Sequence, residues 1–271
     1  FLVQEERYSG LQLKIPTGNH AVLTANTRMF WLDDSYYQTA YFTKEDTADY
    51  TSFIGESIRL AYTHNTLNRK QFASSGSFFE VKASYVRGRE LTLPGSTSLL
   101  DDTITKQHKW LSIQLEALSF PFQKQQKINF GLHFKSVLNS QSLFANYTAS
   151  MLALPGLNVL PDLDTYFIAA YRSTQYVCAG TQLIVSPFKN IDLRLDAYAF
   201  LPIIQLVLNP DGSFSYAKPL GGSSFLASGH VIYHSPVGPV RATLNYLPKY
   251  AQPFQFQLGF GYLLFNERAI R

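Results

Sequence analysis

The closing stretch of the chain alternates between two kinds of residue, and this alternation constrains the fold more than any other feature. From Phe254 to Leu264 every even position is large and apolar, whereas the odd positions 255–261 hold only glutamine and glycine. Successive side chains of a β-strand point to opposite faces, so one face of this strand is apolar and the other small or polar. We expect the apolar face to contact lipid and the other face to line a lumen.

Ten further segments carry versions of the same pattern. In chain order they cover residues 11–16, 20–32, 51–63, 77–90, 109–120, 128–139, 173–187, 191–205, 223–236 and 239–247, and the closing strand covers 253–265. Nearly all reach the roughly 9 to 11 residues that a tilted strand needs to cross a bilayer. Together they predict an all-β fold: an antiparallel, up-and-down transmembrane β-barrel formed by a single domain over residues 1–271.

The strand predicted at 191–205 shows the alternation most clearly. Its odd positions up to Leu201 are aliphatic, whereas Asp192, Arg194 and Asp196 occupy even positions. In a soluble β-sandwich this polar face would look to bulk water, and in a wide barrel it would face an aqueous lumen where opposite charges can pair. The pattern of this strand permits both arrangements.

One charged residue falls on an apolar face. Glu56 has the same parity as Ile54 and Ile58 in the strand predicted at 51–63. A charge that faces lipid is costly near the middle of a bilayer. We therefore expect Glu56 to lie near the membrane interface.

Composition excludes several other classes of protein. No run approaches the roughly 18 apolar residues that a membrane helix needs, so a helical membrane protein is excluded. The 17 Tyr and 21 Phe suit half-buried strands and interfacial aromatic girdles. The single cysteine, Cys178, rules out an internal disulfide and a multi-cysteine zinc site. The net charge of +4 comes from scattered residues without a basic stripe, so we expect no nucleic-acid partner.

The predicted connections alternate in length, as they do in outer-membrane barrels with short periplasmic turns and long external loops. We expect long external loops near 33–50, 91–108, 140–172 and 206–222. Two connections break the alternation. Residues 64–76 form a long connection where a turn is expected, and 249–252 form a brief one where a loop is expected.

The odd number of strands has a topological consequence. With eleven antiparallel strands the first and the last run in the same direction, so the sheet cannot close by antiparallel pairing. Either two strands are merged, with 140–172 as the place for the extra one, or the chain is the C-terminal part of a larger barrel. Because the sequence begins at Phe1 and not at Met, we expect a mature or truncated product.

Four segments in the last third of the chain carry a family resemblance. They are 166–180, 191–202, the Ser-Pro-Val-Gly-Pro-Val-Arg segment 235–241, and the Phe-Gln-Leu-Gly-Phe-Gly-Tyr segment 256–262. In these residues the chain resembles the C-terminal barrel of the BamA-like outer-membrane superfamily. It is most similar to the Bacteroidetes branch in which a patatin-like phospholipase domain precedes the barrel.

The resemblance implies a barrel of sixteen strands, of which this chain supplies about the last eleven. It also implies that an arginine of a long external loop lies in the lumen and pairs with an aspartate of a nearby strand. In this sequence the arginine would be Arg172, and its partner would be Asp192 or Asp196. The family's Val-Arg-Gly-aromatic pattern is absent, because Ser173 follows Arg172.

The resemblance further implies that the seam between the first and last strands opens laterally. The residues of that seam would be Phe256, Gly259, Gly261, Tyr262 and Phe265. The two glycines would weaken packing along the seam, and Phe265 resembles the terminal aromatic that serves as an assembly signal in such barrels.

The sequence contains no recognisable catalytic, cofactor-binding or metal-binding motif. Gly55-Glu-Ser57 is the nearest match to a Gly-x-Ser-x-Gly nucleophile turn, but it lacks the second glycine and lies in a predicted strand. His230 and His234 would lie about 13 Å apart along one face of a strand and cannot chelate one ion together. We therefore expect this chain not to be an enzyme; the resemblance implies a lipid acyl hydrolase domain only upstream of it.

The leading hypothesis is a membrane-embedded barrel in the bacterial outer membrane that anchors, secretes or assembles another domain or protein. Its expected partners are outer-membrane lipid and lipopolysaccharide, together with periplasmic domains of the same protein or client proteins. Two alternatives remain. One is a self-contained outer-membrane pore, and the other is a soluble β-sandwich that binds a ligand.

Overall fold

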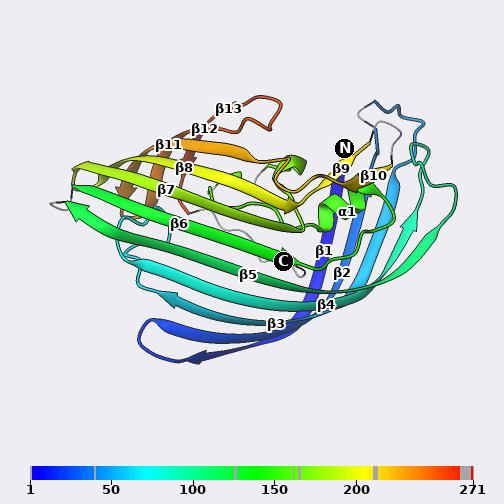
Figure 1. Cartoon of the computed structure of the whole chain (residues 1–271), viewed down its shortest axis with the longest axis horizontal. Helices are drawn as coiled ribbons and strands as arrows, with labels where there is room; N and C mark the ends of the chain where they lie inside the picture. The colour runs from blue at the N-terminus through cyan, green and yellow to red at the C-terminus, as the bar shows by residue number, and fades with distance from the viewer. Residues whose placement is uncertain are drawn as a thin grey trace.

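Eleven strands form one antiparallel sheet in which each strand pairs with its neighbours along the chain. The computed structural model describes residues 2–39, 41–124, 127–160, 162–163, 166–209, 213–262 and 270, with only the backbone of 123–124. The strands are β1 (Leu2–Pro16), β2 (Ala21–Tyr36), β3 (Asp49–Asn65), β4 (Ser77–Leu93), β5 (Ile104–Lys124), β6 (Ile128–Asn139), β7 (Gln175–Phe188), β8 (Ile191–Ile204), β11 (Ser224–Ser235), β12 (Gly238–Tyr246) and β13 (Phe254–Phe260). The predicted all-β, antiparallel, up-and-down fold is confirmed. Figure 1 shows that the sheet is strongly curled.

All eleven predicted strands are present, and their bounds differ mainly at the two ends of the sheet. β6 has the predicted bounds, whereas β1 is much longer than predicted because it pairs with β2 from Leu2 to Pro16. β13 ends earlier than predicted, at Phe260. The next residue, Gly261, has a φ of +85°, a left-handed conformation that interrupts an extended strand. The predicted terminal aromatic, Phe265, lies outside the described residues.

Four elements of the described part of the chain were not predicted, one of which is a single 3-10 turn at Ala169–Tyr171. The strands β9 (Leu206–Leu208) and β10 (Phe214–Tyr216) pair only with each other. The helix α1 (Tyr147–Ala153) begins after Asn146, whose side chain accepts a hydrogen bond from the backbone N–H of Ala149. No helix in the described part of the chain combines the length and hydropathy needed to cross a membrane. The described residues of 140–174 contain no strand of the sheet, so they give no support to a merged strand in this region.

The connections alternate in length as predicted. At one end of the sheet, here called the turn end, 189–190 and 236–237 are two-residue turns. At the other end, the loop end, the connections 37–48, 94–103, 140–174 and 205–223 are long. The exception at the turn end, 66–76, is long because it folds over the inner face of the sheet. We call 66–76 the inner turn and 140–174 the inner loop.

The two faces of the sheet have opposite chemistry. One face, here called the outer face, exposes large apolar side chains along every strand, among them Leu13, Leu23, Leu60, Ile113, Leu132, Leu183, Leu195, Val231, Leu244 and Leu258. The opposite, inner face buries charged and polar residues, among them Arg28, Arg59, His108, Lys135, Asp192, Asp196, His230 and Arg241. A soluble sheet has the reverse arrangement, with apolar residues inside and polar residues outside.

The inner loop and the inner turn supply most of the buried apolar contacts on the inner face. Phe144 and Leu152 of the inner loop pack with Phe30, Phe53 and Trp110 of the sheet. A second cluster joins Leu160, Leu163 and Tyr171 of the inner loop to Tyr176, Phe200 and Leu226. Ala73 of the inner turn packs with Phe120 and Ile184. In Figure 1, α1 lies on the concave side of the curled sheet.

Candidate functional site

A buried ion pair ties the inner loop to the end of the sheet. Arg241 of β12 donates a hydrogen bond from Nη2 to Oδ1 of Asp162 in the inner loop, at 2.6 Å. Only 6% of the arginine side chain and 2% of the aspartate side chain are exposed. Two charges buried to this extent need each other, because each would otherwise lose its hydration without compensation. The pair therefore fixes the position of the inner loop relative to the last strands.

A glycine makes room for this arginine. Gly259 of β13 is the direct cross-strand partner of Arg241. A Cβ atom at Gly259 would lie only 2.6 Å from Nε of Arg241, so the guanidinium group crosses the strand where no side chain is present. The sequence suggested that Gly259 weakens a seam. The structure adds a local reason for a glycine here, which is the path of Arg241 toward Asp162.

Gln257 and Tyr166 complete the contact between the inner loop and β13. In the amide orientation that satisfies both neighbours, Gln257 donates to the two carboxylate oxygens of Asp162 at 2.9 and 3.0 Å, and its oxygen accepts a hydrogen bond from the Tyr166 hydroxyl. Burial raises the pKa of the Tyr166 hydroxyl. The hydroxyl thus stays protonated and remains a donor in this contact.

Substituting Gly259 by alanine tests whether the glycine is needed for the ion pair. We expect Gly259→Ala to displace the Arg241 side chain and to lower the free energy of unfolding by about 1–3 kcal/mol, the usual cost of forcing an extra group into a packed site. Urea titration of the protein in lipid vesicles would measure this. Gly261→Ala is not a suitable control, because Gly261 has a positive φ. Gly229→Ala is suitable, since a Cβ atom added at Gly229 would meet nothing within 4 Å. Equal effects of the two substitutions would contradict the role of Gly259.

The structure does not bring Arg172 to Asp192 or Asp196. Arg172 instead donates from Nη1 to the backbone carbonyl of Leu154 at 2.9 Å, directly after α1, and its guanidinium carbon lies 4.6 Å from the centroid of the Phe167 ring. The last carbonyls of a helix have no partner within the helix, so a nearby cation satisfies one of them. The inner loop does form an ion pair with a strand, but between residues other than those predicted: the loop supplies Asp162 and the strand supplies Arg241.

Asp192 holds the inner turn. Its carboxylate accepts hydrogen bonds from Nη1 of Arg69 at 2.7 Å and from the Ser186 hydroxyl at 2.6 Å, and it lies 2.7 Å from Nε2 of His234. Arg69 belongs to the inner turn, whereas the other residues come from β7, β8 and β11. The turn that leaves β3 therefore reaches strands on the other side of the curled sheet.

Asp196 and Arg194 form a second buried pair beside the inner turn. Nε of Arg194 donates to both oxygens of Asp196, at 2.8 and 2.9 Å. Arg194 also donates to the backbone carbonyl of Ala73 at 3.2 Å, and Nε2 of His230 lies 3.6 Å from Asp196. Phe72 packs against the guanidinium groups of Arg194 and Arg241, at 5.9 and 5.7 Å. Arg241 thus contacts both the inner loop and the inner turn.

A buried Glu–His pair anchors the start of the inner loop. Glu90 and His108 are 2.6 Å apart (Oε2 to Nε2), and their side chains are almost fully buried. The other oxygen of Glu90 accepts a hydrogen bond from the backbone N–H of Ala145 at 2.8 Å, directly before α1. His108 also stacks on Phe144. Strands β4 and β5 thereby hold the segment that leads into the helix.

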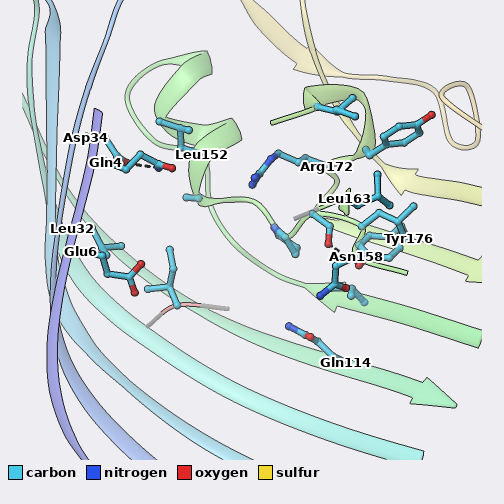
Figure 2. Close-up of a pocket in the computed structure, with 18 of the residues that line it drawn as sticks. Gln4, Glu6, Leu32, Asp34, Gln114, Leu152, Asn158, Leu163, Arg172 and Tyr176 are labelled. Carbon is cyan, nitrogen blue, oxygen red and sulfur yellow. Dashed lines mark hydrogen bonds between the residues drawn. The ribbon is translucent and has the colours of Figure 1, made fainter. Parts of the chain in front are cut away.

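A cavity of about 710 Å³ lies between the inner loop and the inner faces of β1–β7. Figure 2 shows residues from both sides of it, including Glu6 and Gln114 of the sheet and Asn158 and Arg172 of the inner loop. One wall carries Glu116, which accepts a hydrogen bond from Lys135 at 2.7 Å. No group of three or more potential metal ligands occurs among the described residues. His230 and His234 contact different aspartates.

Sequence reasoning identified some residues of these contacts and missed others. Asp192, Asp196 and Gly259 lie in the inner-face network, although with partners other than those predicted. Asp162, Arg241 and Arg69 were missed, because their pairing depends on how two connections fold back over the sheet. The seam residues Phe256 and Gly259 lie on β13, whose second edge has no partner in the described part of the chain. Gly261 and Tyr262 follow that strand.

Comparison with known proteins adds no family to this description. No family model matches the sequence, and no curated protein matches it. The resemblance to the BamA-like superfamily therefore stays a prediction.

Proposed function

We propose that this chain is the membrane-embedded part of an outer-membrane β-barrel that anchors, secretes or assembles another domain or protein. In this proposal its interior is filled by its own connections, and its role is not enzymatic. The outer face would contact lipid, the loop end would face outward from the cell, and the turn end would face the periplasm.

The observation that carries the proposal is the opposite chemistry of the two faces. Leu195 and Leu258 are 55% and 75% exposed on the outer face, whereas Asp196 and Arg241 are buried on the inner face. Exposed apolar side chains along all eleven strands would cost free energy in water, but not against lipid. This arrangement favours a membrane barrel over the soluble β-sandwich.

The filled interior favours an anchoring or assembly role over a diffusion pore. The inner loop and the inner turn both pack on the inner face, where a buried ion pair fixes the inner loop and a half-buried one fixes the inner turn. Pore-forming barrels keep a water-filled channel, whereas barrels with other roles are plugged by loops or helices. We therefore rank the pore as the second candidate.

In the described part of the chain the end strands β1 and β13 each have one unpaired edge, and this supports the proposal of additional strands. β1 and β13 are the two end strands of the sheet, and with eleven antiparallel strands they run in the same direction. Exposed strand edges invite pairing, and a closed barrel removes them. Five more strands next to β1 would give the sixteen that the family resemblance implies, and the new first strand would then run antiparallel to β13. In that family the additional strands follow a patatin-like domain, which would be the domain that the barrel anchors or secretes.

Electrical recording tests the anchoring proposal against the pore. The full-length protein would be reconstituted into planar lipid bilayers, with insertion verified by protease protection. Because two fixed segments obstruct the interior, we expect no steady ohmic conductance. A steady conductance with substate-free openings would instead support the pore. Solubility without detergent, with no insertion into lipid, would contradict both and favour the β-sandwich.

A further inference from the structure

The charged residues of the outer face are confined to one region. Among the described side chains that point outward from the eleven strands, the charged ones are Glu5, Arg7, Asp33, Glu56, Arg87, Arg89 and Lys109. All of them lie on β1–β5, on the loop-end side of an uninterrupted apolar band. On β4 and β5 that band ends at Tyr85 and Leu111, which are direct cross-strand partners.

Three of these charges are cations that sit next to one another. Arg87 and Lys109 are direct cross-strand partners, one pleat beyond Tyr85 and Leu111. Side chains in such positions have Cβ atoms about 4.5–5.5 Å apart. Arg89 points to the same face two residues further along β4, and two residues of a strand span about 7 Å. All three residues are exposed.

The acidic residues nearby do not balance this cluster. Glu56 forms an ion pair with Arg87. The other outward acids are engaged elsewhere, since Glu5 pairs with Arg7 and Asp33 accepts a hydrogen bond from Tyr50 at 2.5 Å. Neither Arg89 nor Lys109 has an ion-pair partner among the described residues. Like charges placed directly opposite each other in a sheet are destabilising, so this arrangement favours a bound anion.

We propose that Arg87, Arg89 and Lys109 bind the phosphate of a lipid headgroup in the external leaflet. The proposal rests on the membrane position proposed above. Acyl chains would lie on the exposed side chains of Ile58, Tyr85 and Leu111, directly below the cations. Guanidinium groups bind phosphate oxygens through paired hydrogen bonds, and an ammonium group adds a point charge. A phosphorylated glycolipid such as lipid A offers both the phosphate and the acyl chains that this surface fits.

The test compares phosphorylated and dephosphorylated lipid A. The full-length protein would be placed in phosphatidylcholine nanodiscs and titrated with each lipid, and native mass spectrometry would count the bound molecules. We expect the wild type to prefer the phosphorylated form. Arg89→Gln combined with Lys109→Gln should weaken its binding at least about tenfold, because two charge-assisted hydrogen bonds are lost. Arg87 stays in this variant, so its pair with Glu56 is kept.

A matched control removes the same charge elsewhere at the loop end. Lys44 and Lys106 are exposed, and neither belongs to the outer-face cluster; Lys106 pairs in register with the inward-facing Glu90. Lys44→Gln combined with Lys106→Gln should leave lipid A binding unchanged. Equal binding of the two lipid A forms by the wild type, or equal losses in both double variants, would overturn the proposal. Displacement by inorganic phosphate at the concentration of lipid A would show a free-phosphate site, which also overturns it. Insertion into the nanodisc is scored separately, so loss of discrimination without loss of insertion contradicts this inference and leaves the proposed function standing.

Discussion

Replacing Asp162 by alanine is expected to lower the free energy of unfolding by about 3–5 kcal/mol, the usual effect of removing one partner of a buried ion pair. The substitution leaves the guanidinium group of Arg241 buried and without its carboxylate. Nη1 of Arg241 already has no hydrogen-bond partner in the described structure, so little is left to compensate. The measurement is a reversible urea titration in lipid vesicles, followed by the fluorescence of Trp31 and Trp110.

Two further variants separate the ion pair from the general effect of a substitution. Asp162→Leu combined with Arg241→Met removes both charges, and we expect it to be much closer to the wild type than either single variant. Glu5→Ala breaks an exposed pair with Arg7 and should leave the free energy of unfolding close to the wild-type value, because exposed ion pairs contribute little. If Asp162→Ala behaves like Glu5→Ala, the pair does not hold the inner loop.

Replacing Leu195 by arginine is expected to destabilise the protein in a bilayer by about 2–4 kcal/mol, the cost of a cation facing lipid at the midplane. Leu195 lies on the outer face of β8, between Leu183 of β7 and Gly229 of β11. The space above Gly229 is open, so the longer side chain fits without a steric clash. The decrease in the free energy of unfolding therefore shows whether the outer face contacts lipid or water. The same urea titration measures it.

The matched control lies on the same strand and the same face. Leu201 is close to the loop end of β8, and Leu201→Arg should cost only about 0–1 kcal/mol, because a charge near the interface stays hydrated. In a soluble β-sandwich both leucines would face water, and both substitutions would stay within about 0.5 kcal/mol of the wild type. Equal and small effects would thus contradict the membrane position. A larger decrease in the free energy of unfolding for Leu195→Arg than for Leu201→Arg would support the membrane position.

The strands of the sheet could be predicted from the sequence because the alternation of apolar and polar residues that marks a strand is visible within a single segment. Alternation in segments such as 128–139 fixes both the strand and the side chains that share a face. The bounds of β1 could not be predicted in this way, since Leu2–Gly10 become a strand through pairing with the long β2. The helix α1 was missed because it is only seven residues long and is held by packing against β2–β5, not by a strong amphipathic pattern.

The inner-face contacts were less predictable than the strands. Alternation places Asp192, Asp196 and Arg241 on the inner face, but it does not identify their partners. Those partners lie in the connections between strands. The sequence of a connection has no repeating pattern that predicts which part of the sheet it packs against. The length of 66–76 was the available signal, because a connection much longer than a tight turn has enough residues to pack against another part of the sheet. Glu56 was expected near the interface, and it lies in the first row of charges beyond the apolar band.

The inner turn also has a consequence for the order in which the protein folds. Its ion pair joins Arg69 to Asp192, which are 123 residues apart in sequence, and Arg69 contacts His234 across 165 residues. The described strands of the large sheet, in contrast, each pair with the preceding and following strand of that sheet. Contacts between distant residues form slowly, because the intervening chain must first be ordered. Pairing can therefore advance hairpin by hairpin, whereas docking of the inner turn must wait until β8 and β11 are in place, which makes it a late kinetic step.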